Sequence, residues 1–301
     1  MAFPYHYLLC KSFEKMYANL VSDSQHIKME SIKGYTGVVV RSYPDDYFNS
    51  DSLSNHVTEE HRMRAVFNPR KFKSPFDYWQ QLSQHIKEHT SASDLRELIY
   101  HNSSEANVFN PMIAISAFKC FPQIKTVLDP CAGWGDRRIA ATIVGLELYI
   151  GYDTNLSLKP AYEALDTRLT KLSSETKSQI HFEPFEQANI SDLPLFDCVF
   201  TSPPFFDLEI YEGSDTSTTL YKSKQDWFTK FYDVLLAKSI KLIKSGGYIM
   251  LYIPDYMYKH TYDFLIKKHC NPLLPIGFYQ SIPSHTTVVT SKIRNLYIWQ
   301  T

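Results

Sequence analysis

Short apolar runs alternate with longer amphipathic stretches along the second half of the chain. Apolar runs at residues 126–129, 148–152, 195–200 and 248–253 predict buried strands, and the stretches at 158–172, 226–243 and 256–268 predict helices. Two more strands, at residues 276–282 and 296–299, are predicted to close the chain. This alternation predicts an α/β fold with a doubly wound, mostly parallel sheet that ends in an antiparallel pair.

The pattern changes near residue 107. Residues 1–106 mix short amphipathic segments with polar and aromatic stretches, and they predict a smaller mixed α+β N-terminal domain, a candidate for substrate recognition. Residues 107–301 hold the alternating strands and helices of a larger domain. A chain of 301 residues with 44% hydrophobic residues is long enough to bury one large core and a smaller one.

The turn after the first predicted strand contains two glycines. It begins at Asp129 and continues through Pro130, Cys131, Ala132, Gly133, Trp134 and Gly135. The glycines let the backbone approach a ligand where a Cβ would collide, and Asp129 can accept from a ligand's ammonium group. The next strand ends in Asp153, where open α/β sheets bind ribose hydroxyls. The turn lacks the third glycine of dinucleotide loops and the Lys-Ser/Thr pair of phosphate loops, which argues against both.

A stiff turn follows the strand predicted at residues 195–200. Its residues are Thr201, Ser202, Pro203, Pro204 and Phe205. The prolines fix φ and donate no hydrogen bond, so the carbonyls of Ser202 and Pro203 are free to accept from a ligand. These acceptors beside the Phe205 ring suit a planar heterocycle that carries an exocyclic amine, because they localise the nitrogen lone pair for attack. The alternative is a turn that merely ends a strand.

Together the two turns resemble those of class I S-adenosylmethionine-dependent methyltransferases, and within them the nucleic-acid amino-methyltransferases that modify cytosine N4 or adenine N6 in DNA. The resemblance covers roughly residues 107–301 and implies a Rossmann-like fold with S-adenosylmethionine as cofactor. It implies catalytic roles for Ser202, Pro203, Pro204 and Phe205. The family uses Asp/Asn-Pro-Pro-Tyr for adenine N6 and Ser-Pro-Pro-aromatic for cytosine N4, so Ser202 leans mildly toward cytosine.

The resemblance also implies a set of cofactor-binding residues. Asn110 precedes a predicted helix with proline at its first position, and it is a candidate contact for the cofactor carboxylate or a purely structural cap. Glu186 and Asn189 compete for the adenine amine of the cofactor, or are both loop residues. The full set is Asn110, Asp129, Cys131, Ala132, Gly133, Trp134, Gly135, Asp153, Glu186 and Asn189.

A basic segment at residues 61–73 contains no acidic residue. It interleaves Phe67 and Phe72 with five cations, which are Arg62, Arg64, Arg70, Lys71 and Lys73. Cations beside aromatic rings favour phosphate binding and base stacking, so the segment is a candidate nucleic-acid contact. The alternative is an ordinary solvated helix end and loop.

Composition limits the other possibilities. The net charge is −1, so nucleic-acid affinity has to come from a local patch. Five scattered cysteines without metal-ligand spacing predict free thiols and no metal. There is no apolar run of membrane-spanning length and no signal-peptide pattern at the first residues, which predicts a soluble intracellular protein, cytoplasmic or nuclear, with no membrane partner.

The predicted activity is methyl transfer to cytosine N4 or adenine N6, with DNA favoured over RNA and the target base flipped out or single-stranded. Cytosine C5 chemistry would need a cysteine after the proline of the catalytic turn, and residues 201–206 contain none. Two alternatives stay open: an RNA or protein-amide N-methyltransferase, and a non-catalytic nucleic-acid-binding partner subunit with the same fold. A monomer or a homodimer is expected, with or without a partner subunit.

Overall fold

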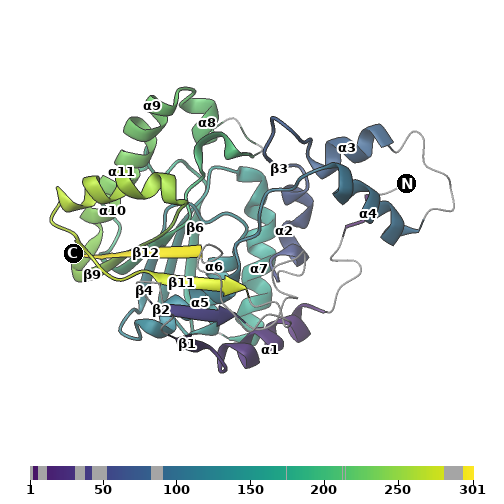
Figure 1. The fold of residues 1–301 in the computed structure, drawn as a ribbon. Coiled ribbons are helices and arrows are strands. Elements are labelled where there is room, and N and C mark those ends of the chain that lie inside the picture. Colours follow the sequence, from purple (N-terminus) through teal and green to yellow (C-terminus); the bar gives the residue numbers. More distant parts are fainter. Residues whose placement is uncertain are drawn as a thin grey trace.

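The computed structural model describes residues 3–5, 12–30, 38–42, 53–82, 91–173, 175–211, 213, 215–280 and 294–301. One large sheet forms its centre, and helices cover the sheet (Figure 1). Five neighbouring strands, from β6 at one edge of the sheet inward, run parallel to one another in the order β6, β5, β4, β7 and β9. Their bounds are β4 Thr126–Asp129, β5 Leu148–Tyr152, β6 Lys177–His181, β7 Phe196–Thr201 and β9 Ile243–Tyr252.

The sheet continues beyond β9 with the end of the chain. β12 (Arg294–Gln300) lies antiparallel between β9 and β11 (Ile276–Gln280), and the short β10 (Asn271–Pro272) also pairs with β12. A parallel sheet that winds outward in both directions from β4 and ends in an antiparallel pair is what the sequence predicts. The predicted α/β fold class is therefore confirmed.

Successive residues of the central strands face two different cores. Val127 and Cys198 belong to one cluster, together with buried residues of α5 (Pro111–Cys120), α6 (Asp136–Ile143) and α7 (Lys159–Leu172). Leu128 and Val199 belong to the other cluster, with η5 (Trp227–Tyr232, π-helical), α10 (Asp233–Lys241) and α11 (Asp255–Ile266). Strands buried on both faces explain why their sequences are continuous apolar runs.

Part of the N-terminal region joins the large sheet. α1 (Phe13–Ser24) buries Phe13 and Leu20 in the first of the two clusters, and β2 (Val38–Ser42) pairs in parallel with β11. β1 (Lys28–Glu30) pairs with β2 at the edge. Among the described residues of 1–106, a separate small core is found only around α3 (Pro75–Leu82) and α4 (Ala92–Asn102), which project to the right in Figure 1. The predicted boundary at residue 106 stays a prediction.

The remaining elements are short and lie near the loops that follow the strands. They are α2 (Asn55–Arg62), β3 (Val66–Phe67), η3 (Leu156–Leu158), η4 (Phe206–Leu208), β8 (Glu209–Ile210), α8 (Ser217–Leu220) and α9 (Lys224–Asp226). Within the ranges given above, no helix combines the length and apolarity that a membrane crossing requires.

Candidate active site at the carboxyl ends of the parallel strands

The glycine loop and the Ser-Pro-Pro-Phe turn leave the same edge of the sheet from adjacent strands. Val127 on β4 pairs with Cys198 on β7, and Leu128 pairs with Val199, in parallel register. The carboxyl ends of neighbouring parallel strands face the same crevice, which is where open α/β sheets bind ligands. The structure therefore brings together two motifs that are far apart in the sequence.

The glycines of the loop have backbone conformations that favour glycine. Gly133 has φ +61° and Gly135 has φ +94°, both in the left-handed region. A Cβ on Gly135 would lie 2.8 Å from Leu165 Cδ2, so this glycine is needed for packing against α7. A Cβ on Gly133 would meet only the Cys131 carbonyl, at 4.0 Å, so the loop has open space on that side. Gly133 is thus the position where a ligand can approach the backbone.

Asp153 fastens the glycine loop from the neighbouring strand. Its carboxylate accepts from the Gly133 N–H and the Asn155 N–H, both at 2.9 Å. Burial raises the pKa of Asp153 to about 6, although these two N–H donors act in the opposite direction. The residue stays partly exposed beside the loop. This location is compatible with the predicted ribose contact, which stays a prediction.

Asp129 is in a different environment from the one the sequence suggests. The residue is fully buried, and its Oδ2 accepts from Arg137 Nε at 2.6 Å and from the Tyr149 hydroxyl at 2.7 Å. Arg137 also donates to the Cys131 carbonyl within the loop. In this structure the carboxylate supports the loop from beneath through Arg137, and the predicted ammonium contact stays a prediction.

Asn110 begins α5 with only half of its side-chain amide satisfied. Its Oδ1 accepts from the Met112 N–H at 2.8 Å, which is the predicted N-cap. Its Nδ2 is buried and has no hydrogen-bond partner among the described residues. Phe109 packs on Tyr252 and under the Arg137 guanidinium, which places the start of α5 against the loop and the end of β9. A buried donor without a partner is a group that a ligand carboxylate would satisfy.

Glu186 and Asn189 differ clearly in their surroundings. Glu186 is buried, accepts from the Tyr221 hydroxyl at 3.1 Å, and has its pKa raised by burial. Asn189 is exposed, and its Oδ1 accepts from the N–H and the hydroxyl of Ser191. This local turn leaves Glu186 as the stronger candidate of the two for a cofactor contact.

Cys131 lies in the glycine loop, close to several carboxylates. Burial, together with the charges of Asp129 and Asp153, raises its pKa well above the ordinary thiol value. The thiol therefore stays protonated near neutral pH, and a protonated thiol is a poor nucleophile. Its neighbours Ala132 and Trp134 are buried; the Ala132 N–H donates to the Tyr152 carbonyl at 2.7 Å, which ties the loop to β5.

The catalytic turn is fixed by two hydrogen bonds. The Ser202 hydroxyl donates its only proton to the Tyr252 carbonyl at 3.1 Å. The lone pairs of the Ser202 oxygen are therefore left to accept from a ligand. The Phe205 carbonyl accepts from the Tyr256 hydroxyl at 3.2 Å. Pro203 is buried, whereas Pro204 and Phe205 are partly exposed. Phe206 follows with φ +54°, an uncommon conformation for a residue with a Cβ.

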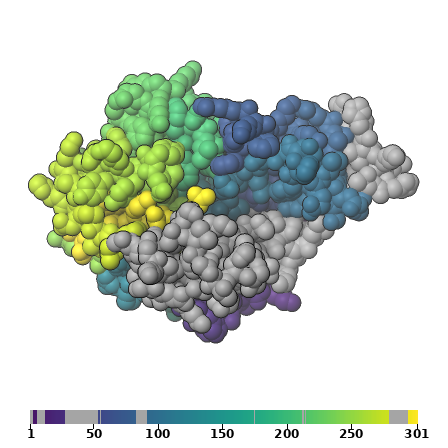
Figure 2. Space-filling view, viewed as in Figure 1, coloured from purple at the N-terminus to yellow at the C-terminus, as the bar shows by residue number. Residues whose placement is uncertain are grey.

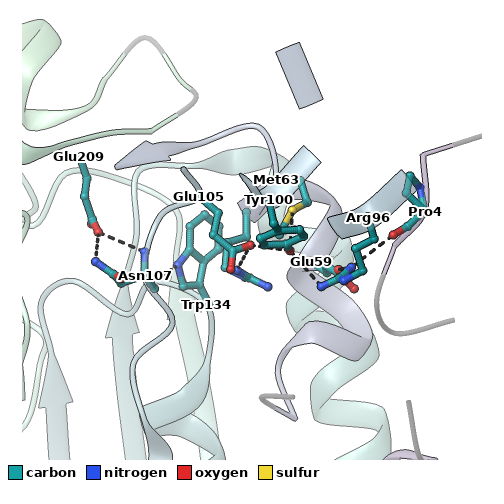
Figure 3. Close-up of polar contacts among 10 residues, drawn as sticks. Pro4, Glu59, Met63, Arg96, Tyr100, Glu105, Asn107, Trp134 and Glu209 are labelled. Atoms are coloured by element: carbon teal, nitrogen blue, oxygen red, sulfur yellow. Dashed lines mark hydrogen bonds and ion pairs between the residues drawn. The ribbon is translucent and has the colours of Figure 1, made fainter. Parts of the chain in front are cut away.

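A polar bridge that the sequence did not reveal joins the loop to the segment after this turn. Glu209 Oε1 accepts from the Asn107 N–H and from Asn107 Nδ2, each at 3.1 Å, and the Asn107 carbonyl accepts from Trp134 Nε1 at 3.2 Å (Figure 3). Glu209 lies on β8, which pairs with β3, so that Phe67 is opposite Glu209. Asn107 and Glu209 carry no motif, and only their spatial contact reveals them.

The basic segment is divided between a buried part and an exposed part. Arg62 is fully buried and pairs with Glu105 at 2.5 Å, which does not support its predicted contact with nucleic acid. The Tyr100 hydroxyl also donates to Glu105, at 2.8 Å, and Figure 3 shows Tyr100 close to Met63 and Arg96. Arg64 is partly buried, with its guanidinium 3.8 Å from the centre of the Phe76 ring.

Arg70, Lys71 and Lys73 are exposed, and their segment contacts the residues that follow the Ser-Pro-Pro-Phe turn. Arg70 pairs with Asp207, and the Asn68 N–H donates to the Leu208 carbonyl at 2.8 Å. The space-filling view shows the blue atoms of this region directly against green atoms of the residues after the turn (Figure 2). In the ranges that the structure describes, no group of three or more His, Cys, Asp or Glu residues could hold a metal ion.

The sheet order and the antiparallel strands at the end of the chain define a Rossmann-like α/β fold. Searches of protein-family models and of curated proteins found no match to this sequence.

Solved structures of methyltransferases are similar to part of this chain. A methyltransferase from Pyrococcus furiosus is 14% identical, with 75% of this chain and 95% of that chain covered and a TM-score of 0.42. An rRNA methylase from Streptococcus thermophilus is 12% identical, with 65% and 98% covered and a TM-score of 0.39. A precorrin-6y C5,15-methyltransferase from Geobacter metallireducens is 14% identical, with 64% and 88% covered and a TM-score of 0.40. At identities and TM-scores this low, none of them assigns an activity to this chain.

Proposed function

We propose that this protein transfers a methyl group from S-adenosylmethionine to an exocyclic amine of a nucleic-acid base, cytosine N4 or adenine N6. The observation that carries the proposal is the parallel register of β4 and β7, in which Leu128 is opposite Val199. This register sets the glycine loop beside the Ser202 to Phe205 turn. A methyltransferase of this class needs its cofactor loop and its amine-binding turn at one crevice, so that the two reactants can meet in line.

Four residues of this chain fit the cofactor. Gly133 leaves open space above the loop, Asp153 is a partly exposed acceptor, Asn110 holds a buried amide donor without a protein partner, and Glu186 is a buried acceptor. In this proposal Asn110 donates to the carboxylate of the methionine part, Asp153 accepts from the ribose, and Glu186 accepts from the adenine amine. When bound, S-adenosylmethionine supplies an electrophilic methyl group on a positively charged sulfur.

The turn at Ser202 acts on the target amine. An aryl amine is a weak nucleophile, because its lone pair is delocalised into the ring. The Ser202 hydroxyl, oriented by its bond to the Tyr252 carbonyl, and the carbonyl groups before the two prolines accept the amine hydrogens. These bonds pull the nitrogen toward tetrahedral geometry and localise its lone pair, while the Phe205 ring provides a face on which the base stacks.

No covalent enzyme intermediate is needed for this reaction. The turn itself contains no cysteine, and the thiol of Cys131 in the adjacent loop is held protonated by its raised pKa. With the cofactor held by Asn110, Asp153 and Glu186, the amine at the Ser202 turn would displace the sulfur from the methyl carbon directly and would then release one proton. Amine methylation, rather than C5 methylation through a cysteine, is therefore the chemistry that these residues support.

The decisive experiment supplies methyl-labelled S-adenosylmethionine with separate DNA and RNA pools, digests them to nucleosides, and identifies the product by mass spectrometry. We expect labelled N4-methylcytosine or N6-methyladenine, and the pool that carries it identifies the polymer. Ser202→Ala should lower the signal, whereas Ser245→Ala, which changes an exposed serine near the opposite end of β9, should not. Label in a protein amide, or cofactor binding without any labelled nucleoside, would contradict the proposal.

A further inference from the structure

Two exposed aromatic residues, each accompanied by cations, lie on separate segments beside the catalytic turn. Phe72 is 40% exposed and lies between Lys71 and Lys73 in the basic segment. Tyr256 is 53% exposed and lies in the first turn of α11. Aromatic faces combined with cations are the means by which proteins bind single-stranded nucleic acid, because rings stack on bases and cations pair with phosphates.

The segment that carries Phe72 is attached to the residues that follow Phe205. Arg70 pairs with Asp207, and the Asn68 N–H bonds to the Leu208 carbonyl at 2.8 Å. β3 then pairs with β8 directly after η4. Although Arg70 is paired with Asp207, its side chain is 79% exposed, so the guanidinium is also accessible to a phosphate. These attachments place the first aromatic platform, Phe72 with its neighbouring cations, on one side of the turn.

The second platform is attached to the turn itself. The Tyr256 hydroxyl donates to the Phe205 carbonyl at 3.2 Å, and Lys224 Nζ lies 5.5 Å from the centre of the Tyr256 ring. Asp207, two residues after Phe205, pairs with Arg70 of the segment that carries Phe72. In Figure 1, α9 and α11 lie on the left of the upper edge of the molecule, and β3 and α3 lie on the right.

We propose that the substrate is a single-stranded segment of nucleic acid that crosses the catalytic turn between the two platforms, an inference that rests on the proposed function. Nucleotides on one side of the target base stack on Tyr256, with Lys224 near their phosphates. Nucleotides on the other side stack on Phe72, with Lys71 and Arg70 near their phosphates. The pair of Asp207 with Arg70 limits repulsion of the passing strand.

The geometry favours a single strand over an intact duplex. Bases in a duplex stack on one another and leave no free face for Phe72 or Tyr256, whereas bases of a single strand offer a face to each platform. An amine held by Ser202 must also belong to a base that has left its stack. The two platforms therefore recognise the same unstacked form of substrate that the chemistry requires.

Binding can be measured by fluorescence anisotropy with labelled oligonucleotides of about 12 nucleotides, within the known range for single-strand sites. Tyr256→Ala and Phe72→Ala should each weaken the Kd by about 5- to 150-fold, because each removes a stacking surface. Tyr256→Phe keeps the ring and loses only the hydrogen bond to the Phe205 carbonyl. Because one hydrogen bond contributes little net free energy, the Kd should stay within about threefold of the wild-type value. Tyr262→Ala and Lys259→Gln, which change exposed residues on the same helix, serve as matched controls.

Substrates with the target base at one end test whether the platforms lie on opposite sides. A strand that begins at the target base has nucleotides on one side only, and a strand that ends there has them on the other. We expect Tyr256→Ala to weaken the Kd for one of these substrates and Phe72→Ala to weaken it for the other. Equal effects of both substitutions on both substrates would overturn the two-sided arrangement.

The inference and the proposed function fail in different ways. If wild-type protein methylates nucleic acid but Tyr256→Ala and Phe72→Ala bind single strands as the wild type does, the platforms are wrong and the reaction stands. If both variants lose binding as expected but no nucleoside is labelled, the platforms stand and the proposed reaction is wrong. A wild-type protein that binds no single strand, or binds duplex more tightly, overturns the inference whatever it methylates.

Discussion

Asp129 and Arg137 form a buried ion pair beneath the glycine loop, with Arg137 Nε 2.6 Å from Asp129 Oδ2. Asp129→Ala leaves the Arg137 guanidinium buried without its partner, so we expect the free energy of unfolding to fall by about 3 to 5 kcal/mol. Urea denaturation measures this loss. The exposed Asp192→Ala is the control and should change little. A variant as stable as the wild type would show that the pair does not support the loop.

The affinity for S-adenosylmethionine should depend on the ionisation of Asp153. Because its pKa is raised to about 6, the carboxylate is charged at pH 7 and accepts the ribose hydroxyls well. As the pH falls through about 6 the group takes up a proton, and calorimetric titration should show the affinity falling. Asp153→Asn should bind weakly at every pH, without this step. A wild-type affinity that is flat between pH 5 and pH 7 would remove Asp153 from the cofactor site.

Ionisation of the same carboxylate should lower the free energy of unfolding, whereas it raises the affinity for the cofactor. The folded pKa lies above the ordinary value of 3.8, so the protonated form is favoured in the folded state. This contribution is complete below about pH 3.8 and is lost as the pH rises through about 6. Comparing the pH dependence of unfolding for wild type and Asp153→Asn isolates it, because the amide cannot ionise. Identical pH dependences would mean that the Asp153 pKa is not raised.

Ser202→Ala should separate catalysis from cofactor binding. It removes one acceptor for the target amine but leaves the carbonyls of the turn, so turnover should fall by about 10- to 1,000-fold. Cofactor affinity, measured by calorimetry, should stay unchanged, since Ser202 lies on β7's turn and not in the glycine loop. Wild-type turnover at saturating cofactor would show that the turn does not hold an amine.

Phe205→Ala in the same turn should act on substrate affinity as well as on rate. It removes a stacking surface worth about 1 to 3 kcal/mol per base. We therefore expect a higher KM for the nucleic acid together with a lower kcat. A fall in kcat alone would show that the base does not rest on this ring.

Arg62 and the three exposed cations of the basic segment should respond differently to the same change. Replacing Arg70, Lys71 and Lys73 with Gln should weaken nucleic-acid binding and flatten the plot of log affinity against log salt by about 0.7 to 0.9 per lost phosphate contact. Arg62→Gln should instead destabilise the fold, because Glu105 loses its buried partner. An unchanged salt slope in the triple variant would return the segment to ordinary solvated surface.

The sequence predicted most of the elements but misplaced some of their ends. The helix predicted at residues 226–243 ends at Lys241, and β9 begins at Ile243, so Gly246 and Gly247 lie inside the strand. Gly246 has φ +76° within β9, and the pairing of β9 with β7 shifts register between Phe196 and Cys198. The glycines therefore mark an irregularity in the strand. Only the partner strand determines this, because glycine permits both structures.

The sequence by itself determined the fold class, the two turns and the residues that carry the candidate chemistry. Apolar runs buried on both faces produce a parallel sheet, and positive φ at Gly133 and Gly135 can be inferred from local backbone sterics. These features depend on each residue and its immediate neighbours. A single sequence records such local constraints directly.

The tertiary structure alone decided how the charged and polar groups are used. Asp129 and Arg62 resemble ligand contacts in the sequence, yet each is buried against a partner, Arg137 in one case and Glu105 in the other. Tyr256 has no motif and reaches the Phe205 carbonyl from a position 51 residues away. The role of a charge depends on which opposite charge lies within a few ångströms and on how much water reaches it, and both depend on contacts between distant parts of the chain.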